Sequence, residues 1–109
     1  MPGALEGLRV LDLTEREGHL CGRLLADLGA EVIKIEPPEG DPSRHVGPFA
    51  SNSSGIESSL TFINLNTNKK SVTLDLGSED GRQAFRHLAR DADAVVETFA
   101  PGTLEAWGL

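Results

Sequence analysis

The feature that most constrains the fold is a strand–helix–strand pattern near the N-terminus, with almost no loop inside it. Residues 8–13 form an apolar run that predicts a β-strand, and residues 31–35 predict a second strand. Between them, leucines recur at helical spacing up to Gly29, which is placed to end the helix. Because the connections are so short, the pattern favours a βαβ unit with parallel, right-handed strand pairing.

The start of the first helix is predicted from a capping box. Thr14 precedes Glu17 by three residues, a spacing at which the hydroxyl accepts from a helix N–H and the carboxylate reaches back. We therefore expect this helix to begin at Thr14.

A similar pattern occupies the second half of the chain. Residues 71–76 alternate between apolar and polar side chains and predict a strand. Ser78 is a suitable N-cap for a helix that runs through Arg90, and residues 93–97 predict a further strand. Two βαβ units predict an α/β fold, a parallel sheet with flanking helices.

Residues 36–69 separate the two halves and show little regular pattern. This 34-residue segment is rich in proline and glycine and contains a serine-rich stretch at residues 51–59. Connections of this length are uncommon in compact domains and are usually functional. A disordered linker between two subdomains is the alternative. Four apolar residues speak against that alternative, because we expect them to anchor the loop to the core: Leu60, Phe62, Ile63 and Leu65.

The end of the sequence bears on domain organisation. A helix is predicted from Thr103, close to the last residue, Leu109. The last predicted strand would then be poorly covered, with an exposed sheet edge. We expect residues 1–109 to be one portion of a longer domain.

Composition and charge narrow the class of protein. Ten basic and seventeen acidic residues give a net charge of −7, which speaks against a nucleic-acid-binding surface. The single cysteine, Cys21, excludes a disulfide framework, and His19, His45 and His87 lack metal-ligand spacing, so no metal site is expected. No apolar run is long enough to span a membrane, and the N-terminus does not resemble a signal peptide. We expect a soluble, cytoplasmic protein.

The topology predicts where a ligand would bind. Ligands of open parallel sheets bind beyond the carboxyl ends of the strands. Four segments meet at that edge, two of them at predicted helix N-termini that attract phosphate: residues 14–17, 36–38, 76–78 and 98–102. This arrangement favours a phosphorylated, nucleotide-like ligand.

A nicotinamide dinucleotide is the first such ligand to consider, and the first turn argues against it. That cofactor requires G-x-G-x-x-G so that the pyrophosphate can approach the backbone. The turn here has no glycine between Thr14 and Glu17 and carries two carboxylates that repel phosphate. Glu36 does lie where a ribose-binding acid would be expected, but a single acid is common by chance.

Several blocks of sequence together resemble the family III CoA-transferases. The blocks follow the order of that family and cover nearly the whole chain: residues 5–13, 24–36, 40–44, 66–71, 74–76 and 95–102. Several blocks in one order are far more specific than any single block. The chain therefore resembles the N-terminal part of the proteins of this family, which includes formyl-CoA transferases and acyl-CoA racemases.

The resemblance implies a fold and a mechanism. It implies a Rossmann-like large domain that binds CoA, in an enzyme of two interlocked subunits, identical or different. An aspartate carboxylate of such enzymes attacks an acyl-CoA, and CoA then passes through an enzyme thioester to an acceptor carboxylic acid, a covalent route that divides one difficult step. No aspartate of this chain matches the motif of the nucleophile, so no catalytic residue is assigned here.

The resemblance also implies which positions contact CoA. They lie in the strand-end loops: Arg16, Glu17, Leu74, Asp75, Leu76, Gly77, Thr98, Phe99 and Ala100. Pro37 and Ala106 stand where some relatives place CoA-contacting arginines. Losing two such charges removes favourable phosphate contacts. Four other cations are alternatives for that role: Arg16, Arg44, Lys69 and Lys70.

The sequence leaves three readings of function open beside the transferase. The chain could be a non-catalytic CoA-binding module or a degenerate partner subunit of the same fold. It could belong to an acyl-CoA racemase or epimerase. A nicotinamide-dependent oxidoreductase is the most distant reading, because of the first turn.

Overall fold

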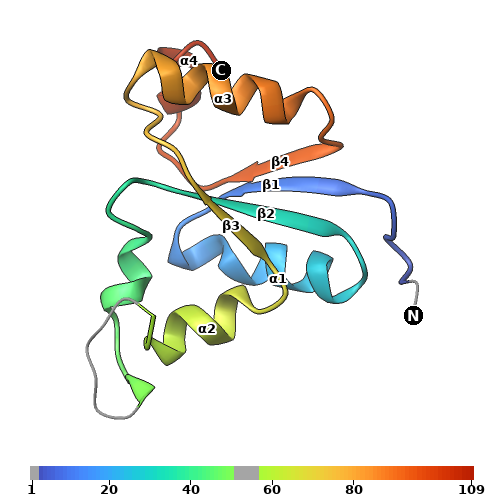
Figure 1. Cartoon of the computed structure of the whole chain (residues 1–109), viewed down its shortest axis with the longest axis vertical. Helices are drawn as coiled ribbons and strands as arrows, with labels where there is room; N and C mark the ends of the chain where they lie inside the picture. The colour runs from blue at the N-terminus through green and yellow to red at the C-terminus, as the bar shows by residue number, and fades with distance from the viewer. Residues whose placement is uncertain (1–2, 51–56) are drawn as a thin grey trace.

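The computed structural model of the chain describes residues 3–50 and 57–109, and its centre is a parallel sheet (Figure 1). Four strands occur in the order β3-β2-β1-β4: β1 (Arg9–Leu13), β2 (Glu31–Glu36), β3 (Lys70–Thr73) and β4 (Ala94–Glu97). All three strand pairs are parallel, which confirms the predicted α/β sheet. β4 forms one edge of this sheet, and Val95 is exposed there.

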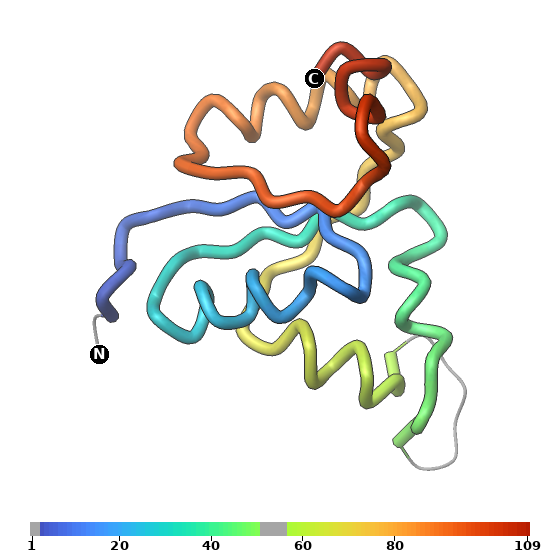
Figure 2. The backbone as a smooth tube through the Cα atoms, turned by 180° about the vertical axis from the view of Figure 1, so that it is seen from behind, coloured from blue at the N-terminus to red at the C-terminus, as the bar shows by residue number. Residues whose placement is uncertain are grey.

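Helices cover both faces of the sheet. The helices are α1 (His19–Asp27), α2 (Leu60–Asn66), α3 (Glu79–Ala89) and α4 (Thr103–Ala106), with 3₁₀ turns η1 (Arg16–Gly18) and η2 (Pro42–His45). Figures 1 and 2 show α1 and α2 below the sheet and α3 and α4 above it. The chain therefore has three layers, and the connections that contain α1, α2 and α3 provide the crossovers that parallel strands require.

The two faces of the sheet are packed differently. On the α3 side, alternate residues of β1 and β2 join a continuous apolar core: Leu11, Leu13, Ile33, Ile35, Leu76 and Phe85. On the α1 side, Val10 and Val32 begin an apolar cluster, but Asp12 and Lys34 follow them on the same face, and both are buried. The sheet therefore carries a buried polar layer near the carboxyl ends of its strands.

The first helix begins later than its sequence predicts. Thr14 does not cap a helix, because its hydroxyl and its backbone N–H both donate to Asp12 Oδ1, at 2.5 and 2.8 Å. The capping-box prediction is therefore wrong: η1 comes first, and α1 begins at His19. The end of the helix is as predicted, with Gly29 at a φ of 109° that favours glycine.

The third strand is shorter than its sequence predicts. It ends at Thr73 because Asp75 folds the chain into a turn, accepting from Gly77 N at 2.9 Å through its side chain and from Ser78 N at 3.1 Å through its carbonyl. Ser78 then caps α3 as predicted, accepting from Gly81 N at 3.0 Å. Residues 74–77 are consequently a loop rather than a strand.

The segment between β2 and β3 contains regular structure that was not predicted. It includes η2 and α2, and residues 51–56 of its serine-rich stretch lie outside the described residues. The predicted apolar anchor is wrong at Leu60 and Ile63, which are 42% and 46% exposed. A buried polar group joins two parts of the segment: Ser59 Oγ lies 3.0 and 2.6 Å from the carbonyl oxygens of Ser43 and Val46 and is shared between them. The described parts of this segment are therefore ordered, unlike a disordered linker.

Candidate functional site

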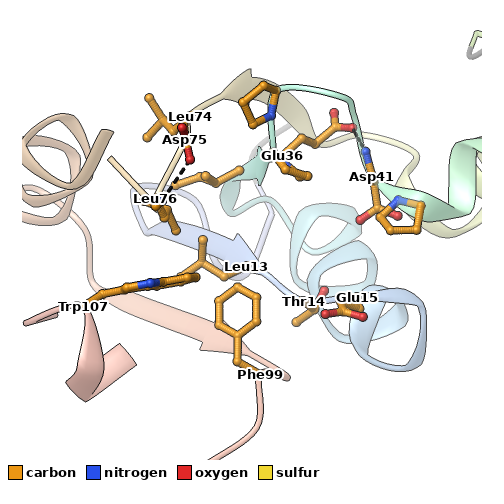
Figure 3. A pocket seen from close by; sticks show the side chains of 15 residues that line it. Leu13, Thr14, Glu15, Glu36, Asp41, Leu74, Asp75, Leu76, Phe99 and Trp107 are labelled. Atoms are coloured by element: carbon orange, nitrogen blue, oxygen red, sulfur yellow. Dashed lines mark hydrogen bonds between the residues drawn. The ribbon is translucent and has the colours of Figure 1, made fainter. Parts of the chain in front are cut away.

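A pocket of about 380 Å³ opens at the carboxyl ends of the four strands (Figure 3). Its size is within the range of about 300–1,000 Å³ that is usual for small-molecule sites. The lining residues come from the loops after every strand and from the C-terminal turn: Leu13, Thr14, Glu15, Ile35, Glu36, Pro37, Pro38, Asp41, Pro42, Leu74, Asp75, Leu76, Gly77, Phe99 and Trp107. Each of the four segments predicted from the topology contributes to this wall.

Most of the pocket wall is apolar, and two aromatic rings form one side of it. Phe99 and Trp107 pack edge to face, with ring centroids 5.5 Å apart and planes at 80°. In Figure 3 these rings lie opposite the loop of Leu74 and Leu76. Sequence reasoning missed Trp107, although it is the single tryptophan and follows a strand-end segment in the predicted last helix. A flat, uncharged group fits a wall of this kind.

The residues expected to contact CoA separate into two groups. Those in and around the β3–α3 loop line the pocket, together with Phe99: Leu74, Asp75, Leu76 and Gly77. Four others do not line it: Arg16, Glu17, Thr98 and Ala100. Thr98 has an indirect place, because its Oγ1 accepts from Glu15 N at 2.7 Å and so joins the loops after β1 and β4.

The ionisable residues of the pocket wall are all acidic. Glu15, Glu36, Asp41 and Asp75 line it, and no lysine or arginine does so among the described residues. Two of these carboxylates, Glu36 and Asp41, are buried and paired with cations. Glu15 and Asp75 are exposed, and neither has an ion-pair partner in residues 3–50 or 57–109.

Glu36 is occupied by partners from this chain. It accepts from Arg44 Nε at 2.7 Å, from Arg44 Nη2 at 2.8 Å and from the backbone N–H of Asp41 at 2.8 Å, and it also accepts from Ser71. Burial raises the pKa of Glu36, but these hydrogen bonds and the charge of Arg44 outweigh it and lower the pKa to about 2. A carboxylate held in this way does not offer the free acceptor that a ribose diol requires. The geometry therefore gives no support to the nicotinamide reading.

Asp41 belongs to a buried cluster behind the pocket wall. Lys34 Nζ lies 3.0 Å from Asp41 Oδ2, 3.0 Å from His19 Nε2 and 3.1 Å from the carbonyl oxygen of Thr14. Burial raises the pKa of Asp41, but hydrogen bonds from His19 and Ser43 and the charge of Lys34 hold that pKa well below its usual range. Thr14 and Asp41 both line the pocket, so Lys34 holds two parts of its wall in place.

The ring orientation of His19 follows from its neighbours. Asn66 Oδ1 accepts from Lys69 Nζ at 2.7 Å, and Asn66 Nδ2 donates to the carbonyl of Phe62 at 3.0 Å, which fixes the amide. The same Nδ2 lies 3.2 Å from His19 Nδ1, and His19 Nε2 lies 3.2 Å from Asp41 Oδ2 and 3.0 Å from Lys34 Nζ. The histidine that the sequence left without a role therefore links α1, α2 and the loop after β2.

Three of the four cationic side chains considered for phosphate contacts lie beside acidic side chains of this chain and do not line the pocket. Lys69 Nζ is buried 2.6 Å from Asp12 Oδ2, and Arg44 pairs with Glu36 and lies 3.8 Å over the ring of Phe62. Lys70 lies 3.6 Å from Glu31, at the start of β2 and away from the pocket. Burial lowers the pKa of Lys69 in spite of its contact with Asp12. Arg16 is the one member of this group that is exposed on a strand-end loop.

Two further observations concern other classes of site. Across residues 3–50 and 57–109, no group of three or more His, Cys, Asp or Glu side chains is placed to hold a metal ion. No helix in that part of the chain is both long and apolar enough to cross a bilayer.

Comparison with known proteins identifies the family. The family sequence model for CoA-transferase family III matches residues 5–109 of this chain. The chain is 47% identical to succinyl-CoA:mesaconate CoA-transferase of Haloarcula hispanica over 104 residues, which is 94% of this chain and 26% of that protein. It is 43% identical to succinyl-CoA:(R)-benzylsuccinate CoA-transferase subunit BbsE of Thauera aromatica, over 93% of this chain and 25% of that protein.

A solved structure agrees with these sequence matches. The crystal structure of a CAIB/BAIF family protein from Brucella suis superposes with a TM-score of 0.89 at 39% identity, over 100% of this chain and 29% of that one. The chain therefore spans about a quarter of the length of the curated relatives that it matches. The chain belongs to CoA-transferase family III.

Proposed function

We propose that this chain supplies the CoA-binding surface of an acyl-CoA:carboxylate CoA-transferase, and that the strand-end pocket receives the adenosine end of CoA. The observation that carries the proposal is the pocket itself, which lies where open parallel sheets bind nucleotides and has a wall of apolar and aromatic residues. Membership of family III supports the ligand class. Phe99 and Trp107 supply a surface against which the adenine ring packs.

In this proposal the chain binds and orients its substrate but does not supply the nucleophile. Asp12 and Asp41 are unsuited to attack a thioester, because both are buried and paired with lysines. The aspartyl anhydride and thioester that the family resemblance implies would form on a residue outside residues 1–109. The acceptor is a carboxylic acid, and the assembled enzyme is a dimer in the cytoplasm.

A second candidate function is a non-catalytic subunit that pairs with a catalytic one. The observation that favours it is the similarity to BbsE, which is described as a subunit of its transferase. Transfer of CoA to an acceptor acid by a mixture with a catalytic partner, but not by the homo-oligomer, would select this candidate. Racemisation of a chiral acyl-CoA without an acceptor acid would select a racemase instead.

CoA binding by the 109-residue chain tests the proposal. Trp107 is the single tryptophan and lines the pocket, so its fluorescence reports occupancy directly. We expect a saturable change in emission on titration with CoA, matched by heat in calorimetry. No change in either signal at millimolar CoA would overturn the proposal.

A matched pair of variants locates the binding site. Pro38→Phe places a large ring at the pocket wall, whereas Glu39→Phe places it on the next residue, which is exposed and outside the lining. We expect Pro38→Phe to weaken CoA binding at least about fivefold, because overpacking costs about 1–3 kcal/mol. Glu39→Phe should leave the affinity within twofold of the original chain.

A further inference from the structure

The block of residues 66–71 belongs to the family resemblance but supplies none of the pocket-lining residues that the structure describes. It runs from the end of α2 into β3. Lys69 of this block is buried, with a side chain that is only 1% exposed. Because protein encloses its ammonium group, any effect of Lys69 on a ligand in the pocket must pass through the groups that Lys69 contacts.

Three oxygen atoms surround the ammonium group of Lys69. Its Nζ donates to Asp12 Oδ2 at 2.6 Å, to Asn66 Oδ1 at 2.7 Å and to the carbonyl of His19 at 2.9 Å. An ammonium group has three N–H donors, so all of them are used. Lys69 therefore ties β1 to the start of α1 and to the end of α2, and it fixes one oxygen of the Asp12 carboxylate.

The other oxygen of Asp12 holds a residue of the pocket wall. Asp12 Oδ1 accepts from Thr14 Oγ1 at 2.5 Å and from Thr14 N at 2.8 Å, and the carbonyl of Thr14 accepts from Lys34 Nζ at 3.1 Å. All three polar groups of Thr14 are therefore bound behind the wall. Thr14 and Glu15 both line the pocket, and Figure 3 shows them where the chain leaves β1. The path of the chain at this point depends on a carboxylate that Lys69 holds in place.

We propose that Lys69 is a positioning residue for CoA binding, which orients the carboxylate of Asp12 and through it holds Thr14 in the pocket wall. The inference rests on the proposed function, because it assumes that CoA enters this pocket. Lys69 then raises the affinity for CoA without touching a phosphate, since a wall that is already in place spares the ligand the free energy of ordering it. The segment between β2 and β3 thereby gains a role, because its last residues support the pocket from behind.

Two double variants separate positioning from charge and from packing. The amide variant, Asp12→Asn with Lys69→Gln, removes both charges but keeps an oxygen at residue 12 that accepts from Thr14. The apolar variant, Asp12→Leu with Lys69→Met, removes the same charges and leaves Thr14 without that acceptor. Neither variant leaves an uncompensated buried charge, so both should keep the fold, which circular dichroism checks. Trp107 fluorescence gives the affinity of each variant for CoA.

The inference predicts different affinities for the two variants. We expect the amide variant to bind CoA within about threefold of the original chain and the apolar variant to bind about tenfold more weakly, because apparent affinity falls with the fraction of chains whose wall is in the binding conformation. Equal weakening in the two variants would overturn the inference, because the charge of Lys69 would then act on CoA directly. Unchanged affinity in both would also overturn it, because the ion pair would then serve the fold alone.

A rescue experiment covers the case in which the apolar variant does not fold. Lys69→Gln alone leaves Asp12 buried without its cation and should weaken CoA binding. Adding Asp12→Asn should then restore at least about threefold of the affinity, because the two residues are coupled. No restoration would overturn the inference.

Lys70→Gln is the matched control, because it removes the neighbouring charge, which is exposed. It should change the affinity for CoA by less than about twofold. If the original chain binds no CoA, the proposed function falls together with this inference, whereas every other outcome leaves the proposed function intact.

Discussion

Lys34 and Asp41 form an ion pair at 3.0 Å behind the wall of the pocket, with side chains only 1% and 5% exposed. Lys34 is in the middle of β2, and Asp41 is in the loop that follows. The next residue on the same face of the strand, Glu36, pairs in turn with Arg44 of η2. These two ion pairs hold the loop after β2 against the sheet, and that loop supplies Pro37, Pro38 and Pro42 to the pocket.

Replacing Lys34 with methionine should strongly destabilise the fold. The variant keeps the apolar stem but leaves Asp41 buried without its cation, a change that costs about 3–5 kcal/mol. Urea unfolding measured by circular dichroism gives the change in the free energy of unfolding. Adding Asp41→Asn should recover about 1 kcal/mol or more, because the two residues are coupled. The exposed Lys70 serves as a control, and Lys70→Met should change stability by less than about 0.5 kcal/mol. An equal effect at both lysines would contradict this account.

Stability should fall as the pH decreases from 4.5 to about 2, in part because of Glu36. The pKa of Glu36 is lowered in the folded chain from 4.5 to about 2, so its ionised form stabilises the fold above pH 4.5. That contribution is lost as Glu36 is protonated toward its folded pKa. Thermal unfolding across this pH range should show a shallower slope for Glu36→Gln than for the original chain. If the stability of the two proteins depended on pH in the same way, the pKa of Glu36 would not be lowered in the folded chain.

Glycine is required in the middle of α1, where alanine is normally the better helix former. A Cβ at Gly22 would lie 2.5 Å from Asp12 Oδ2 and 3.0 Å from Lys69 Cε, so it would displace the buried ion pair. We expect Gly22→Ala to destabilise the fold by about 1–3 kcal/mol, as overpacking does, in place of the gain of about 1 kcal/mol expected from helix propensity. Chemical denaturation measures the difference. Cys21→Ala, at the exposed neighbouring position, should be close to neutral.

A cation introduced at the pocket should strengthen CoA binding. Pro37 lines the pocket, and the family resemblance implies an arginine at this position in some relatives. We expect Pro37→Arg to improve the affinity for CoA several-fold, and to improve it more for CoA than for 3′-dephospho-CoA. Paired fluorescence titrations give both affinities. An arginine that improved the two ligands equally would place the 3′-phosphate away from this wall.

The sheet and its two main crossovers were predictable because their residues follow simple periods. The apolar run of β1 and the leucines of α1 leave few alternatives, and the short connections fix the parallel order. The same rule predicted where the pocket lies, since the carboxyl ends of parallel strands meet at one end of the sheet. Helix α2 was missed because Leu60 and Ile63 are exposed and no clear apolar face marks the helix.

The buried polar cluster could not be predicted from local pattern. Lys34 in Val-Ile-Lys-Ile-Glu has the alternation of a half-exposed strand, yet α1, α2 and the loop after β2 cover that face. His19 and Asn66 are 47 residues apart and meet only in the folded chain. A pair of opposite charges at residues 34 and 41, and another at 36 and 44, was the one signal in the sequence that could have indicated this cluster.

Backbone NMR spectra of the 109-residue chain, recorded with and without CoA, test the central claim most directly. The account predicts chemical-shift changes at Thr14 and Glu15, in the loop of residues 74–77, at Phe99 and at the indole N–H of Trp107. It predicts no changes at residues 91–93, which directly precede β4 and lie at the amino ends of the strands. Shifts confined to the surface of α1 and α2, or an unchanged spectrum at millimolar CoA, would contradict the assignment of this pocket to CoA.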